Sequence, residues 1–225
     1  MRRMEILLGC SKVTIARKIA YLAEQAQIAH EAFLANPENH TTYALMDELE
    51  TFIHARYKQV SVPVVIRSKN RTILAFGVAR TPSKLPLGGA GQGPLPPGGV
   101  PWRRDDRPRV VPAVLEQAGR AMKPGAKLAT DGASSYPKWI ERSLPGVIHV
   151  IGHSPDEKSL ARAKKRADGE PREFDPLQPI NVTFATMRND LARLGRKTWT
   201  TTKTMRGLEQ HLWIYVAWRN GYKLQ

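Results

Sequence analysis

The stretch Tyr43-Ala44-Leu45-Met46-Asp47-Glu48-Leu49-Glu50-Thr51-Phe52-Ile53 decides the fold, because it reads as a β-strand that carries acidic residues. Side chains alternate between the two faces of a strand. Every second residue from Leu45 to Ile53 therefore shares one face with Asp47, and Glu48 and Glu50 lie on the other. We expect Asp47 to project from this strand among apolar neighbours.

Further strands and helices follow this stretch in a recognisable order. Pro63 interrupts the second strand, and we expect a bulge there because proline has no N–H to donate to a neighbouring strand. The order, three strands and then helix, strand, helix, strand and helices, predicts an α/β fold: a ribonuclease H-like mixed five-stranded sheet flanked by helices. The expected strands are 43–53, 60–66, 72–78, 127–130 and 147–151, and the expected helices are 112–122, 136–143, 181–196 and 205–218.

The first 38 residues form a small helical module, and residues 40–225 form the main domain. Gly9-Cys10-Ser11 separates a short helix from the helix 14–22, which resembles a helix-turn-helix DNA-binding unit. The alternative is an amphipathic helix pair with a solvated basic face. In the main domain, residues 81–107 are rich in Gly and Pro and predict a flexible insert. The residues of the module that we expect to bind DNA phosphates are Lys12, Arg17 and Lys18.

The charge balance points to an anionic partner. The chain has 225 residues with 35 Lys and Arg against 20 Asp and Glu, a net charge of +15 and a pI near 10.2. No apolar run approaches the ~20 residues of a spanning helix, so nucleic acid is favoured over a membrane surface. Cys10 is the single cysteine, which excludes an internal disulfide and predicts a reducing cytoplasm.

Three distant residues have the chemistry of a magnesium site. Asp47 lies on the first strand and Asp131 ends another, in Thr130-Asp131-Gly132, while Asn181 offers a neutral amide oxygen at the start of a basic helix. Arg188, seven residues after Asn181, returns to the same helix face, where its charge suits a phosphate or a leaving oxygen. Each residue also has a simpler reading, a turn carboxylate or a helix cap. Further basic residues extend the DNA-binding track: Arg193, Arg196, Lys197 and Lys203.

Three motifs resemble the DDE transposases of small bacterial insertion sequences, in the branch related to IS-One-type elements. They are Met46-Asp47-Glu48-x-x-x-Phe52, Thr130-Asp131-Gly132-x-x-x-Tyr136, and the C-terminal segment from Asn181 through Arg188 to Trp199. The resemblance covers about residues 40–220. Much of the family has glutamate as third ligand, and some branches have asparagine there, as this chain does. Family members usually carry an N-terminal zinc ribbon, which this chain lacks, so we expect end recognition to be impaired.

The resemblance implies a transposase that uses Mg²⁺ or Mn²⁺ to cleave a DNA strand and then joins the freed 3′-hydroxyl to target DNA. It implies double-stranded DNA partners, both element ends and target, assembly as a homo-oligomer, and a bacterial, nucleoid-associated location in the cytoplasm. Two alternatives are a nuclease or resolvase of the same fold and a truncated, non-catalytic DNA-binding protein or repressor. A zinc hydrolase using His149 and His153 is a remote alternative, because no third ligand lies nearby in the sequence.

Overall fold

A computed structural model describes residues 2–54, 58–82, 104–152, 175–195 and 202–224. The helices are α1 (Arg2–Leu8), α2 (Lys12–Ala35), α3 (Arg107–Gly119), α4 (Tyr136–Ser143), α6 (Gln178–Asp190) and α7 (Met205–Asn220). Short 3₁₀ turns are η1 (Pro37–Asn39) and η2 (Ala192–Leu194). The strands are β1 (Thr41–Phe52), β2 (Gln59–Arg67), β3 (Ile73–Phe76), β4 (Ala79–Arg80), β5 (Met122–Thr130) and β6 (Ile148–Ile151).

The strands form one mixed six-stranded sheet in the order β3-β2-β1-β5-β6, with β4 also paired to β2. The β1–β2 and β2–β3 pairs are antiparallel, whereas β1–β5 and β5–β6 are parallel. The long strand β1 therefore lies at the centre, between the antiparallel and parallel halves. The prediction of an α/β protein with a mixed sheet flanked by helices is confirmed, but the sheet has six strands and not the predicted five, because the short β4 adds to β2.

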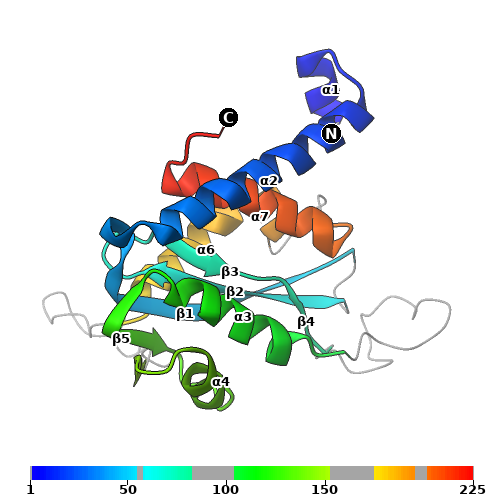
Figure 1. Ribbon diagram of the computed structural model, residues 1–225. Helices are drawn as coiled ribbons and strands as arrows, with labels where there is room; N and C mark the ends of the chain where they lie inside the picture. The colour runs from blue at the N-terminus through cyan, green and yellow to red at the C-terminus, as the bar shows by residue number, and fades with distance from the viewer. Residues whose placement is uncertain (1, 55–57, 83–103, 153–174, 196–201, 225) are drawn as a thin grey trace, which may run out of the picture.

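Helices cover both faces of this sheet (Figure 1), and each face has its own apolar core. Alternation along β1 divides its side chains between the two cores. Leu45 and Leu49 pack with residues of α6 and α7, and Met46 packs with residues of α3 and α4. Asp47 belongs by this alternation to the α6 and α7 face, and Glu48 to the α3 and α4 face.

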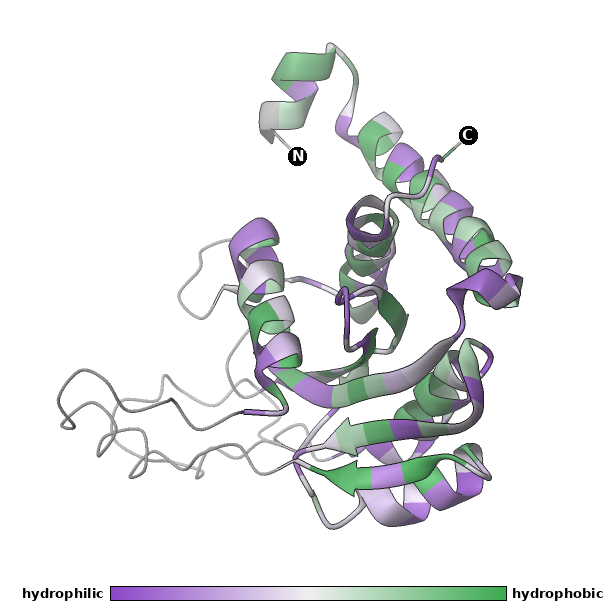
Figure 2. Cartoon of the chain, turned by 90° about the vertical axis from the view of Figure 1, so that its left-hand side faces the viewer, coloured by the Kyte–Doolittle hydropathy of each residue, from purple (hydrophilic) through white to green (hydrophobic). Residues whose placement is uncertain are grey.

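Helix α2 extends well beyond the predicted segment 14–22 and packs along α7. Its cap is as expected, because the Ser11 hydroxyl accepts a hydrogen bond from the Thr14 N–H at 3.2 Å. Ala23 and Ala26 are buried in the core shared with α6 and α7. Figure 2 shows the largely hydrophobic α1 standing away from the sheet at the outer end of α2. Much of α2 thus belongs to the packing of the main domain.

The expected bulge at Pro63 is wrong, because Pro63 keeps its register opposite Glu48 across the β1–β2 pair. On the other side its carbonyl accepts a hydrogen bond from the Gly77 N–H at 3.0 Å, but proline has no N–H to donate in return. Strand β3 ends at Phe76, one residue before Gly77, which lies opposite Pro63. The irregular register between β2 and β3 lies instead at Val65/Ile66.

Three other elements differ from the predicted bounds. Helix α3 begins at Arg107 and includes Pro112, which we expected at its start. Strand β5 begins at Met122, and its first part contains Gly125, whose φ of +70° is not that of an extended strand. The register of β5 against β1 shifts in this part, so the bulge accommodates Gly125. Helix α6 ends at Asp190, because Leu191 turns to an extended conformation and the chain then buries Leu194 in η2.

An ion cluster joins Arg80, the residue just before the predicted insert 81–107, to the last part of that insert. The buried Asp106 carboxylate accepts from Arg80 at 2.6 Å and lies 2.8 Å from the Arg104 guanidinium. Residues 83–103 of that insert lie outside the described residues. Among the described helices, none is both long and apolar enough to cross a membrane.

Candidate active site

Asp47 and Asp131 come together because their strands are parallel neighbours. The β1–β5 pairing ends at Leu45 opposite Ala129, and each aspartate follows two residues later on its own chain segment. Strand β1 continues through Asp47, whereas β5 ends at Thr130 and leaves Asp131 exposed at the carboxyl edge of the sheet. The parallel pairing of β1 with β5 at the centre of the sheet thus positions both carboxylates.

Hydrogen bonds hold the loop that carries Asp131. The Asp131 carboxylate accepts from the Ala133 N–H at 3.1 Å, and the Gly132 N–H donates to the Thr130 hydroxyl oxygen at 3.3 Å. The same hydroxyl makes a 2.9 Å hydrogen bond with His149 Nε2 on β6. His153, the other histidine of the remote zinc alternative, lies outside the described residues.

Gly132 is needed at the turn because its φ is +79° and its place is crowded. An added Cβ would lie 2.7 Å from Cγ2 of Ile151. Gly132→Ala should therefore reduce the free energy of unfolding by roughly 2–4 kcal/mol, the sum of left-handed strain and overlap. Gly146→Ala is the matched control, because Gly146 has φ +86° but nothing within 4 Å of an added Cβ. Urea unfolding of both variants measures the difference, and equal losses would contradict the crowding.

The surroundings of Asp47 favour its protonated form and raise its pKa to about 6. Burial is the largest cause, and the negative charges of Asp131 and Glu48 act in the same direction. The positive charge of Arg188 and a hydrogen bond from the Glu48 N–H act against them. That N–H donates to the Asp47 carboxylate at 2.6 Å. The Asp47 and Asp131 carboxylates repel each other, and a divalent cation bound to both would reduce that repulsion.

Arg188 and Asn181 both lie on α6, but the structure relates them differently to the aspartates. The charge of half-buried Arg188 acts on Asp47, as expected for a cation near the site. Asn181 is exposed, and its amide nitrogen lies 3.5 Å from the Asp175 carboxylate. In the described part of the chain, no hydrogen bond joins Asn181 to either aspartate. The structure therefore groups Asp47, Asp131 and Arg188.

Glu48 faces the core opposite Asp47, as the alternation along β1 predicted. There its carboxylate accepts hydrogen bonds from the hydroxyls of Tyr136, at 2.9 Å, and Ser61. The Glu48 side chain therefore connects β1 to β2 and to the start of α4. In the sequence, Glu48 belongs to the first of the three motifs and Tyr136 to the second, but no pattern indicates that they are in contact.

Burial raises the pKa of the Tyr136 hydroxyl, and the charges of Glu48, Asp131 and Asp47 raise it further. This hydroxyl therefore stays protonated and donates to Glu48. Because its pKa responds to all three carboxylates, Tyr136 lies within electrostatic range of the whole acidic group. Tyr136 itself is almost fully buried, at 2% exposure.

The predicted DNA-binding residues are distributed over two regions. Arg17 and Lys18 are exposed on α2, and Lys12 forms an ion pair with Glu5 of α1 at 3.4 Å. Arg193 is half-buried in η2 and Lys203 is exposed before α7. Arg196 and Lys197 lie outside the described residues.

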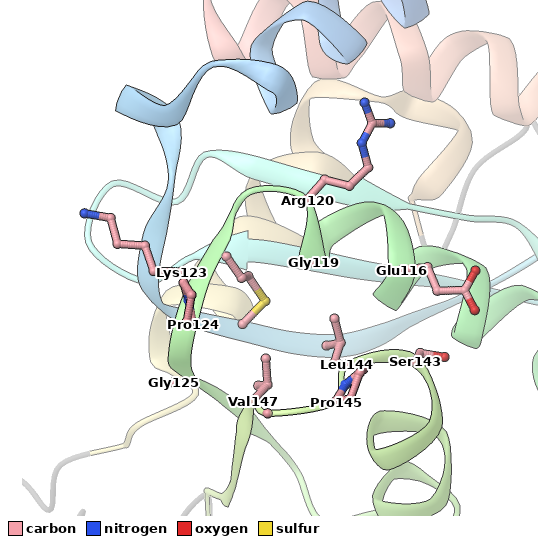
Figure 3. Close-up of a pocket in the computed structure, with 12 residues that line it drawn as sticks. Glu116, Gly119, Arg120, Lys123, Pro124, Gly125, Ser143, Leu144, Pro145 and Val147 are labelled. Atoms are coloured by element: carbon pink, nitrogen blue, oxygen red, sulfur yellow. The ribbon is translucent and has the colours of Figure 1, made fainter.

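A pocket of about 560 Å³ lies at the other end of β5 from Asp131, next to the ends of α3 and α4 (Figure 3). None of the candidate site residues lines it. Within the described ranges, no group of three or more His, Cys, Asp or Glu side chains is arranged to hold a metal ion. The pocket is lined by Glu116, Gly119, Arg120, Met122, Lys123, Pro124, Gly125, Ser143, Leu144, Pro145, Gly146 and Val147.

No protein-family model matches the chain, and no curated protein is significantly similar to it in sequence.

Proposed function

We propose that this protein is a DDE-type transposase that cleaves and joins DNA strands with Mg²⁺ or Mn²⁺, on a ribonuclease H-like core. The observation that carries the proposal is the meeting of Asp47 and Asp131 at neighbouring parallel strands, with the charge of Asp131 acting on Asp47. The sheet supports it as well, because three antiparallel strands followed by two parallel ones is the order that a ribonuclease H-like fold requires.

Asp47 and Asp131 would hold the divalent ions, and their chemistry suits that role. Both offer the hard oxygen ligands that Mg²⁺ prefers, and the repulsion between them is reduced when a cation binds. When bound, Mg²⁺ would activate the attacking oxygen and stabilise the leaving oxygen in phosphodiester cleavage. Asn181 remains a proposed third ligand through its amide oxygen, beside the contact of its nitrogen with Asp175.

The remaining steps concern DNA. Arg188 would bind a phosphate beside the aspartates, because its cationic group lies near Asp47 and phosphate binds guanidinium groups well. Water attacks the scissile phosphorus, the bond to the 3′ oxygen breaks, and a 3′-hydroxyl results. In strand transfer that hydroxyl attacks a phosphorus of the target strand and displaces another 3′ oxygen. The net charge of +15 favours such a polyanionic partner.

The assay that tests the proposal separates cleavage from transfer. The purified protein is incubated with supercoiled plasmid and with a linear duplex ending in a free 3′-hydroxyl, in Mg²⁺, Mn²⁺ or EDTA. A transposase should nick the plasmid and join the duplex to it only with a divalent ion. Nicking without joined product would indicate a nuclease, and metal-independent binding without nicking would exclude both enzymes.

Replacing Arg188 with Ala should weaken DNA binding and lower its dependence on salt. Loss of one phosphate contact reduces the slope of log K against log salt concentration by about one. Lys123→Ala provides the control, because Lys123 is exposed at the opposite end of β5, beside the pocket of Figure 3. Fluorescence anisotropy over a salt series measures both slopes, and an unchanged slope for the Arg188 variant would argue against the phosphate contact.

A second candidate, a non-catalytic DNA-binding protein or repressor, is favoured by one observation. The Asn181 amide contacts Asp175, and no hydrogen bond in the described residues connects it to the aspartates. Under this alternative the basic residues of α2 would bind DNA without cleavage, and the plasmid assay would show binding alone in every metal.

A further inference from the structure

The loop between β5 and α4 is fixed at both ends, and Asp131 lies at its beginning. At the start, hydrogen bonds from Gly132 and Ala133 return to Thr130 and Asp131. At the end, the Tyr136 N–H donates to the Ala133 carbonyl at 3.0 Å, and α4 begins. The position of Asp131 relative to β5 is therefore set locally. Its position relative to β1 is set by the β1–β5 pairing as far as Leu45 and Ala129, and beyond that pairing by contacts that cross between the two segments.

The hydrogen bond from Tyr136 to Glu48 crosses between these segments. Tyr136 follows Asp131 by five residues, and Glu48 directly follows Asp47. The contact joins the two segments on the face of the sheet opposite Asp47. We propose that the Tyr136–Glu48 hydrogen bond is a positioning contact, which holds the Asp131 loop against β1 so that Asp131 stays near Asp47. This inference rests on the proposed role of the two aspartates as metal ligands.

Burial makes this contact strong enough to act in that way. Tyr136 is buried in the core of the α3 and α4 face, and its ring packs against Trp139 with centroids 6.1 Å apart. A hydrogen bond to a carboxylate in such surroundings is stronger than one between neutral groups. Ser61 of β2 donates to the same carboxylate and fixes its orientation. Glu48 is thus held from both sides, and only the Tyr136 side leads to Asp131.

Four variants separate positioning from ordinary burial. Tyr136→Phe removes the crossing hydrogen bond and keeps the ring. Ser61→Ala removes the other hydrogen bond of the same carboxylate, on a strand that carries no aspartate, and serves as the matched control. Glu48→Gln keeps an oxygen that can accept from Tyr136, whereas Glu48→Ala keeps none. A role of Glu48 as a charged ligand would require the carboxylate itself, so the Gln variant distinguishes the two roles.

The first measurement is amide hydrogen exchange of the segment 130–136 in the metal-free protein. We expect faster exchange in Tyr136→Phe and Glu48→Ala and near-normal exchange in Ser61→Ala and Glu48→Gln. Unchanged exchange in Tyr136→Phe would overturn the proposal, and so would equal loosening in Ser61→Ala. This measurement needs neither DNA nor cleavage, so its result is independent of the proposed function.

The second measurement is Mg²⁺ binding, followed by the rise of melting temperature with Mg²⁺ concentration. Residues that orient metal ligands typically change metal affinity by 10- to 100-fold, so Tyr136→Phe should raise the half-saturating Mg²⁺ concentration by about tenfold. Glu48→Gln should stay close to the unmodified protein. A loosened loop with unchanged Mg²⁺ affinity would overturn the positioning role. If the unmodified protein binds no Mg²⁺, both the metal site and the positioning role are wrong. The hydrogen-exchange result would then show only that the Tyr136–Glu48 contact stabilises the loop.

Discussion

Asp131→Asn should reduce Mg²⁺-dependent plasmid nicking by roughly 100- to 1,000-fold, because it removes several kcal/mol of stabilisation supplied through a metal ligand. The amide oxygen can still accept the hydrogen bond that the Asp131 carboxylate takes from Ala133, so the loop should keep its shape. DNA affinity should stay the same or rise slightly, because a negative charge is lost beside bound phosphates. The variant therefore separates chemistry from binding.

Asp190→Asn is the matched control for this result. Asp190 is exposed at the end of α6 and accepts a hydrogen bond from the Tyr215 hydroxyl at 3.4 Å. It belongs to the same helix as Arg188 but not to the group around Asp47. Nicking is measured from initial rates at saturating Mg²⁺, together with DNA binding. Full activity of the Asp131 variant, or an equal loss in both variants, would remove the basis of the proposed site.

Local patterns in the sequence were sufficient for the parts of the site that depend on one segment. Alternation along β1 placed Asp47 and Glu48 on opposite faces, and the apolar run before Asp131 placed that residue at a strand end. Both features follow from strand geometry alone. The pairing of β1 with β5 was implied only by the expected order of elements, and the structure has it with Leu45 opposite Ala129.

Contacts between distant segments were not predictable in the same way. The hydrogen-bond partners of Glu48 depend on the registers of β1 with both β2 and β5, so alternation alone could not identify them. The end of α6 at Asp190 depends on the burial of Leu194, although the basic residues that follow suit a longer helix. Packing energy outweighs local helix propensity in such cases. The long docking of α2 on α7 is a tertiary preference of the same kind.

The burial of Asp47, together with the negative charge of Asp131, leads to the second large effect, which is seen in stability. The pKa of Asp47 is raised to about 6 in the folded chain, so its protonated form stabilises the fold fully below the unfolded value of 3.8, and this contribution is lost as pH rises through 6. Asp47→Asn is neutral at every pH. In EDTA at about pH 8 it should therefore be more stable than the unmodified protein, by on the order of 1–2 kcal/mol, and the advantage should vanish near pH 4.

Addition of Mg²⁺ should reverse this order at about pH 8. A cation that binds only the folded state stabilises it in proportion to the logarithm of its concentration above the dissociation constant. The unmodified protein should gain this stability, and Asp47→Asn should gain much less because one ligand carboxylate is absent. Urea unfolding at both pH values, with EDTA and with Mg²⁺, measures the four differences, and Asp190→Asn should follow the unmodified protein throughout. If Asp47→Asn were less stable than the unmodified protein in EDTA at about pH 8, that result would contradict the raised pKa of Asp47 and the carboxylate pair proposed to hold the metal.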